Sequence, residues 1–128
     1  LAGVVTAGNK ASKTYRNGPD VSANANFTFY TCADRTTCQA NVYGGTSFAA
    51  PMWAGFLALV NQRLASQGKK PIGFINPTVY AKNVTASYGT GFHDITSGRS
   101  GSYSAVAGYD LVTGWGSPKA GLIDELAP

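Results

Sequence analysis

The apolar positions of the chain are concentrated in one segment that predicts a long helix. Residues 51–60 are the longest apolar run, and the polar residues 61–63 follow it. Thr46 or Ser47 is expected to cap this helix with a side-chain oxygen, and Gly68 is a natural stop at its other end. Because the first half of the helix is apolar on almost every side, we expect it to be buried in a larger body.

Shorter patterns predict the remaining elements. Three segments have the β-favouring composition of strands, namely residues 1–7, 27–31 and 39–43. Two segments predict further helical structure, namely residues 76–80 and 119–126. Residues 86–118 are rich in Gly, Ser and Thr and are expected to form an ordered loop.

Length and composition limit the classes of protein that this chain represents. Its 128 residues leave room for one domain and not two. Charged residues make up 12% of it, against about 25% in ordinary soluble domains. A surface with so few carboxylates changes little on protonation, which suits a secreted protein that works in acid. The basic residues are spread along the chain, so the net charge of +4 does not indicate nucleic-acid binding, and no apolar run approaches the roughly 20 residues of a membrane span.

The two cysteines indicate an oxidising compartment. Cys32 and Cys38 lie six positions apart, and no other metal-ligand cluster lies near them. The two cysteines of a redox-active pair are more often separated by two residues, in the motif Cys-x-x-Cys. The spacing favours a disulfide that closes a hairpin loop, and two free thiols are the alternative.

Two segments match the sequon for N-linked glycosylation, Asn-x-Ser/Thr. One starts at Asn26 and ends at Thr28, and the other starts at Asn83 and ends at Thr85. The sequon acts only where the source glycosylates its proteins, and a pattern this short also occurs by chance.

A first candidate for chemistry is the segment 44–51, with the sequence GGTSFAAP. Ser47 follows two glycines at the start of the predicted helix, where the glycines allow close approach of a substrate. The N–H groups and partial positive charge of a helix N-terminus stabilise a developing oxyanion. These features predict that Ser47 is a nucleophile, and the alternative is that it only caps the helix.

A serine nucleophile needs a general base. His93 is the only histidine, and Asp94 beside it in the sequence is badly placed to orient its ring. We therefore interpret His93 as a structural or loop residue and expect the base to lie outside this chain.

A second candidate is the pair of carboxylates in the Gly-rich loop. Asp94 lies in the sequence FHDITSG and Asp110 ends the sequence GYD. Such loops turn carbonyl oxygens inward, and an all-oxygen set suits Ca²⁺. The alternative is that both aspartates only cap turns of the loop.

Taken in order, these motifs resemble the C-terminal part of the sedolisins, the serine-carboxyl peptidases. The likeness covers about residues 19–126 and includes the segments 19–25, 44–51, 53–55, 58–62, 73–77, 92–98, 108–110 and 113–118. Subtilisins share the pattern Gly-Thr-Ser-x-Ala-x-Pro but not the pattern from position 94 to position 118. The resemblance implies an α/β fold, the C-terminal portion of a subtilisin-like fold with a mostly parallel sheet, a buried nucleophile-bearing helix and a Gly-rich calcium loop.

The resemblance also assigns roles to individual residues. Ser47 matches the nucleophile, and its backbone N–H matches part of the oxyanion hole. The residues that match the calcium ligands, by side chain or by backbone carbonyl, are Asp94, Ile95, Val106, Gly108 and Asp110. Position 106 is often Gly in the family, so its carbonyl serves as a ligand only if the backbone angles suit a β-branched residue. His93 has no catalytic role in the family.

Residues 1–128 are thus expected to be the C-terminal portion of the catalytic domain of a secreted endopeptidase that acts on proteins or peptides at acidic pH. The chain does not begin with Met, which favours a start inside a longer precursor. The family's catalytic Glu, its supporting Asp and its oxyanion Asp lie far upstream, so the isolated chain is expected to be inactive without the missing N-terminal part. Two alternatives stay open: a non-catalytic, calcium-stabilised secreted domain, and a subtilisin-type remnant with a His base.

Overall fold

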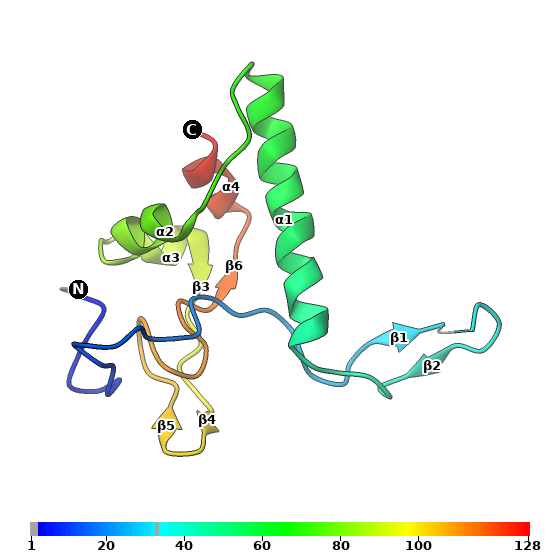
Figure 1. The fold of residues 1–128 in the computed structure, drawn as a ribbon, viewed down its shortest axis with the longest axis horizontal. Helices are drawn as coiled ribbons and strands as arrows, with labels where there is room; N and C mark the ends of the chain where they lie inside the picture. The colour runs from blue at the N-terminus through cyan, green and yellow to red at the C-terminus, as the bar shows by residue number, and fades with distance from the viewer. Residues whose placement is uncertain (1–2, 33) are drawn as a thin grey trace.

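The computed structural model describes residues 3–32 and 34–128. Within them, one long helix stands beside a group of short helices and two-residue strands (Figure 1). The elements, in chain order, are β1 (Tyr30–Thr31), β2 (Gln39–Ala40), α1 (Thr46–Ser66), α2 (Asn76–Asn83), α3 (Tyr88–Gly91), β3 (Phe92–His93), β4 (Arg99–Ser100), β5 (Tyr103–Ser104), β6 (Ser117–Pro118) and α4 (Gly121–Leu126).

Helix α1 confirms the predicted long helix, but its cap differs from the prediction. Gly45 is the N-cap residue, and neither Thr46 nor Ser47 makes a side-chain capping bond. At Gly45 the φ angle is 128°, a conformation that glycine adopts without strain. Its carbonyl accepts the Phe48 N–H at 3.0 Å, so the backbone itself closes the first turn. At the other end Gly68, with φ 68°, stops the helix as predicted.

The disulfide prediction is confirmed in a hairpin that projects from the start of α1 (Figure 1). Cys32 and Cys38 are bonded, with Cα atoms 4.1 Å apart. Strands β1 and β2 pair antiparallel on either side of the loop, and both are shorter than the predicted strands.

Two other sequence predictions are wrong for the described residues. Residues 3–7 form turns instead of a strand, because the Asn9 side chain binds their backbone. It accepts the Thr6 N–H at 3.1 Å and donates to the Val4 carbonyl at 2.7 Å. The first two positions of that predicted strand lie outside the described residues.

The segment 86–118 is not merely a loop. It contains α3 and four short strands, in which β3 pairs with β6 and β4 pairs with β5. All ladders between the described residues are antiparallel, so the mostly parallel sheet implied by the resemblance does not lie among them. The physical reason is that these two-residue strands meet through hairpins and loops, whereas parallel neighbours need a long crossover connection.

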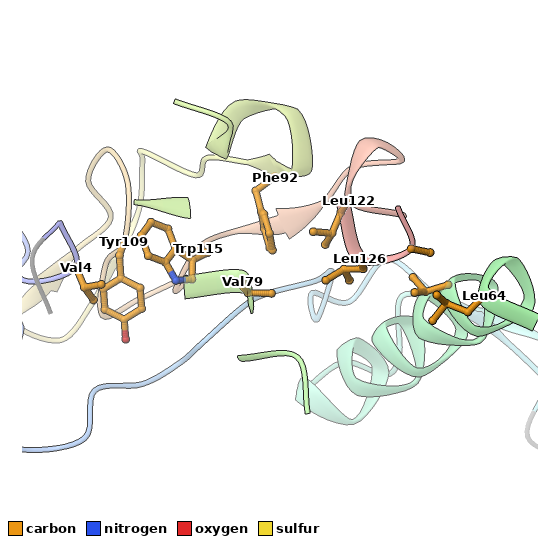
Figure 2. Packing of buried hydrophobic residues seen from close by; sticks show 10 residues of the cluster. Val4, Leu64, Val79, Phe92, Tyr109, Trp115, Leu122 and Leu126 are labelled. Atoms are coloured by element: carbon orange, nitrogen blue, oxygen red, sulfur yellow. The ribbon is translucent and has the colours of Figure 1, made fainter. Parts of the chain in front are cut away.

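The core runs from the N-terminal loop through the centre of the molecule to the contact between α4 and α1 (Figure 2). Trp115 lies at its centre, 2% exposed, and three tyrosine rings surround it at centroid distances of 5.3–5.6 Å. From α1, only Val60 and Leu64 are fully buried among the described residues. Met52 and Leu59 of the same helix are 43% and 53% exposed. Within this chain, the apolar run of α1 therefore has cover on one side only, where Trp53, Phe56 and Leu57 pack against the core.

Candidate functional site

Ser47 lies in the first turn of α1, directly after the two glycines of the segment 44–51. Its side chain is exposed, and its hydroxyl makes no hydrogen bond to any residue that the structure describes. The backbone N–H groups of Thr46 and Ser47 likewise donate to no described residue. The first turn thus presents a free hydroxyl next to the unpaired N–H donors that a helix N-terminus leaves, and such donors can stabilise an oxyanion.

The segment 22–25 fixes the position of this turn. The Gly45 N–H donates to the Ala25 carbonyl at 2.7 Å, and the Trp53 indole N–H donates to the Ser22 carbonyl at 2.9 Å. Gly44 lies against Phe27, and a Cβ at position 44 would meet that ring at 2.8 Å. The first glycine is therefore required by close packing, and the second by its φ angle.

A groove of about 650 Å³ lies beside the first turn of α1. Its walls are formed by Pro19, Val21, Ser22, Ala23, Ala25, Thr46, Ala49, Ala50, Trp53, Ile95, Val112 and Thr113. Ser47 is next to this groove in the sequence but is not one of its lining residues. The groove is mostly apolar, so it suits an apolar side chain more than a charged one.

The loop that carries the two predicted calcium-binding aspartates folds back on itself. Asp94 accepts the Gly108 N–H at 2.9 Å, and Asp110 accepts the Val106 N–H at 3.0 Å. Asp110 is fully buried, and its other oxygen accepts the N–H of Thr113 at 2.7 Å. The structure thus brings each aspartate to a residue predicted to supply a carbonyl ligand.

Some oxygens of this loop are free to serve as ligands of a hard cation. The carbonyl oxygens of Ile95, Val106 and Gly108 accept no hydrogen bond from the residues that the structure describes, which leaves them available as ligands. Val106 does not adopt a left-handed φ, so its β-branched side chain is compatible with this role. Asp110 is buried without an ion pair to a described side chain, and its carboxylate accepts hydrogen bonds from the N–H groups of Val106, Val112 and Thr113. These bonds are also the ones expected of an aspartate that only caps turns of the loop. A set of carboxylate and carbonyl oxygens with these properties suits Ca²⁺.

The same loop also reaches the groove beside α1. Ile95 comes directly after Asp94, and Val112 and Thr113 come directly after the turn at Asp110; all three line the groove. Ordering the loop therefore orders one wall of the groove beside α1.

His93 lies in β3, opposite Ser117 of β6, with an exposed side chain. Between the described residues there is no hydrogen bond that links His93 to Ser47. The geometry is consistent with the interpretation of His93 as a structural residue.

Sequence reasoning missed the part that Asp20 plays in holding the segment that packs against the start of α1. Its carboxylate accepts the Tyr80 hydroxyl at 2.7 Å and the Arg16 guanidinium at 2.6 Å. Burial alone would raise the pKa of Asp20, but the hydrogen bonds from Arg16 and Tyr80 outweigh it and lower the pKa. Its backbone carbonyl accepts the Trp115 N–H at 2.9 Å, which joins this segment to the core. The pairing of an Asp with Tyr80, far along the chain, leaves no local signal in the sequence.

A family model described as the subtilase family matches residues 2–116 of the chain. The chain belongs to the subtilase family. Kumamolisin from Bacillus sp. (strain MN-32) is 37% identical over 124 residues, which cover 91% of this chain and 20% of kumamolisin. Tripeptidyl-peptidase 1 from Mus musculus is 36% identical over 84 residues, which cover 58% of this chain and 14% of that protein. Tripeptidyl-peptidase sed1 from Aspergillus fumigatus is 40% identical over 80 residues, which cover 59% of this chain and 12% of that protein.

These relatives confirm the resemblance to the sedolisins within the subtilase family. The present chain matches a fifth or less of the length of each of these three relatives. As for membranes, a search of the described residues finds no helix with the length and apolar character needed to cross a bilayer.

Proposed function

We propose that this chain is the nucleophile- and calcium-bearing C-terminal portion of a secreted serine-carboxyl endopeptidase, which hydrolyses peptide bonds in proteins or peptides at acidic pH. The observation that carries the proposal is the placement of Ser47, with a free hydroxyl and free neighbouring N–H groups, in the first turn of a helix in a subtilase-family chain. Subtilase relatives named as peptidases support the reaction class.

The proposed reaction is acyl transfer to Ser47. Its Oγ attacks the carbonyl carbon of the scissile bond, and the carbonyl oxygen becomes an oxyanion that accepts the Ser47 N–H. The proton of the hydroxyl passes to a carboxylate base held by the rest of the catalytic domain, and the amine leaves with a proton. Water then hydrolyses the ester and restores the hydroxyl. The isolated chain is inactive under this proposal, because it supplies the nucleophile but not the base.

The uncovered face of α1 supports the existence of a larger catalytic domain. Met52 and Leu59 are large apolar side chains that stay about half exposed, on a helix that buries Val60 and Leu64 against the core. Burying such side chains stabilises a fold by about 1.5–3 kcal/mol each. The proposed remainder of the domain, with its mostly parallel sheet, covers this face.

In the proposed calcium site, Asp94 and Asp110 supply side-chain oxygens, and Ile95, Val106 and Gly108 supply carbonyl oxygens. The bound cation offsets the charge of the two carboxylates and ties together the segments on either side of the β4–β5 hairpin. Its role is structural, because Ser47 and its neighbouring N–H groups carry the proposed chemistry.

Calcium removal tests this site. Chelation of the whole polypeptide should lower its melting temperature by several degrees, since a ligand at about 100 times its Kd stabilises a fold by about 2.7 kcal/mol. Asp94→Asn should remove most of this calcium-dependent shift, whereas Asp34→Asn in the exposed hairpin should keep it. The shift should also shrink at low pH, because protonated carboxylates are poor ligands. An equal melting temperature with and without calcium in the unmodified protein would contradict the site.

The pH dependence of hydrolysis tests the proposed function. The whole polypeptide should cleave an unfolded protein substrate and stay active at pH 4, because a carboxylate base has a pKa of about 4.3. A His base, with a pKa of about 6.5, would instead lose about tenfold in rate per pH unit below that value. The 128-residue chain alone should show no hydrolysis. An activity that disappears below about pH 6 would point to the subtilisin-type mechanism.

A further inference from the structure

The two glycosylation sequons occupy opposite environments in the fold. Asn26 is exposed, in the turn that leads into the β1–β2 hairpin. Asn83 is the last residue of α2 and is only 4% exposed. We propose that Asn26 is an N-linked glycosylation site of the folded, secreted protein, and that Asn83, which matches the same sequon, carries no glycan.

The hydrogen bonds of Asn26 leave its attachment atom free. An N-linked glycan joins the side-chain Nδ2, and the Asn26 Nδ2 donates to no residue that the structure describes. The Oδ1 of the same amide accepts the Phe27 N–H at 3.0 Å. A sugar on Nδ2 leaves that bond in place, because the amide oxygen does not change. The local turn therefore persists after modification.

Among the described residues, the surroundings of Asn26 have room for a bulky hydrophilic group. The hairpin that follows it projects away from the helices (Figure 1). Phe27 and Tyr30, just after the sequon residue, are 56% and 72% exposed. A glycan at Asn26 adds a solubilising group beside this exposed aromatic surface.

Asn83 is blocked by the packing of α2. Its Oδ1 and Nδ2 are both buried and have no hydrogen-bond partner among the described residues. Val79, one turn earlier on α2, belongs to the core and is 2% exposed. A sugar on the Asn83 Nδ2 would have to pass through this packed side of the helix. A chain modified there could not dock α2, so the folded secreted protein lacks a glycan at Asn83.

The modification needs an oligosaccharide joined to a lipid diphosphate, together with a transferase of the secretory pathway. The Asn26 Nδ2 forms a bond to C1 of the first sugar, and the bond from C1 to the diphosphate oxygen breaks. The amide loses one proton to the transferase, and the lipid diphosphate leaves. The inference rests on the secretion in the proposed function and does not depend on catalysis by Ser47.

The experiment is peptide mapping of the whole polypeptide, secreted from a eukaryotic host that glycosylates its proteins. After reduction of the Cys32–Cys38 disulfide, trypsin releases residues 17–35 with one sequon and residues 83–99 with the other. Peptide N-glycosidase, applied to the denatured protein before trypsin, should convert Asn26 to Asp in the first peptide and leave Asn83 unchanged in the second. A map without sugar on residues 17–35, or with sugar on residues 83–99 of the folded protein, overturns the proposal.

Three variants test whether Asn26 is the residue that carries the sugar. Asn26→Gln should remove the whole glycan mass from the secreted protein, and Asn83→Gln should remove none. Thr28→Ala keeps Asn26 but destroys the sequon, so it should give the same mass as Asn26→Gln. A glycan that survives Thr28→Ala would contradict the assignment to this sequon.

Hydrolysis measured on the same samples separates this inference from the proposed function. A glycosylated protein with no peptidase activity would sink the catalytic proposal and leave the glycosylation site standing. An active protein without sugar on Asn26 would contradict the glycosylation site and leave the catalytic proposal standing.

Discussion

Replacing Ser47 with alanine is expected to lower the rate of peptide hydrolysis by the whole protein by about 10⁶-fold, the loss typical of a serine peptidase without its nucleophile. The loss is large because the other parts of the site cannot form the acyl intermediate on their own. The stability of the fold should not decrease. The Ser47 side chain is exposed and makes no hydrogen bond to a described residue, and alanine is the better helix former. The melting temperature should therefore stay the same or rise slightly.

Ser66→Ala is the matched control, because Ser66 lies in the last turn of the same helix. Its hydroxyl donates only to the Arg63 carbonyl, so the substitution should leave hydrolysis unchanged. Activity is measured as kcat/KM on an unfolded protein or peptide at acidic pH, alongside thermal denaturation. If Ser47→Ala keeps more than about a hundredth of the activity, Ser47 is not the nucleophile.

The largest expected effect on stability comes from Gly116→Ala. Gly116 has a φ of 87°, and a Cβ at this position would lie 1.9 Å from the His93 carbonyl oxygen. His93 cannot retreat easily, since its strand β3 is paired with β6. The strained φ costs about 1–2 kcal/mol and the overpacking about 1–3 kcal/mol or more. We expect a loss of at least about 2–5 kcal/mol, a large part of the 5–15 kcal/mol that stabilises a typical protein.

Gly101→Ala separates the two costs of this substitution. Gly101 also has a positive φ, 56°, but no atom lies within 4 Å of a Cβ built there. This control should lose only the cost of the strained backbone, about 1–2 kcal/mol. Denaturant unfolding of both variants in the whole protein gives the comparison. Equal losses in Gly116→Ala and Gly101→Ala would mean that the close approach to His93 is not present in solution.

The sequence by itself determined the elements and groups whose signals are local. The apolar run of α1, the stop at Gly68 and the short spacing of Cys32 and Cys38 all depend on neighbouring residues, and the structure agrees with each of them. The order of the motifs was enough to identify the sedolisin resemblance, which the comparisons confirm. The roles of Ser47 and of the calcium loop stay predictions that the proposed experiments address.

Only the tertiary structure decided the features that join distant parts of the chain. The bond from Tyr80 to Asp20, the wall that Thr113 adds to the groove beside α1, and the approach of Gly116 to His93 each involve residues far apart in the sequence. The same holds for the two sequons, which are equivalent glycosylation signals in the sequence. In the fold, packing buries Asn83 and leaves Asn26 exposed. Short patterns record backbone preference and local polarity. Burial and close approach depend on which segments meet in space, and no local pattern of residues encodes that.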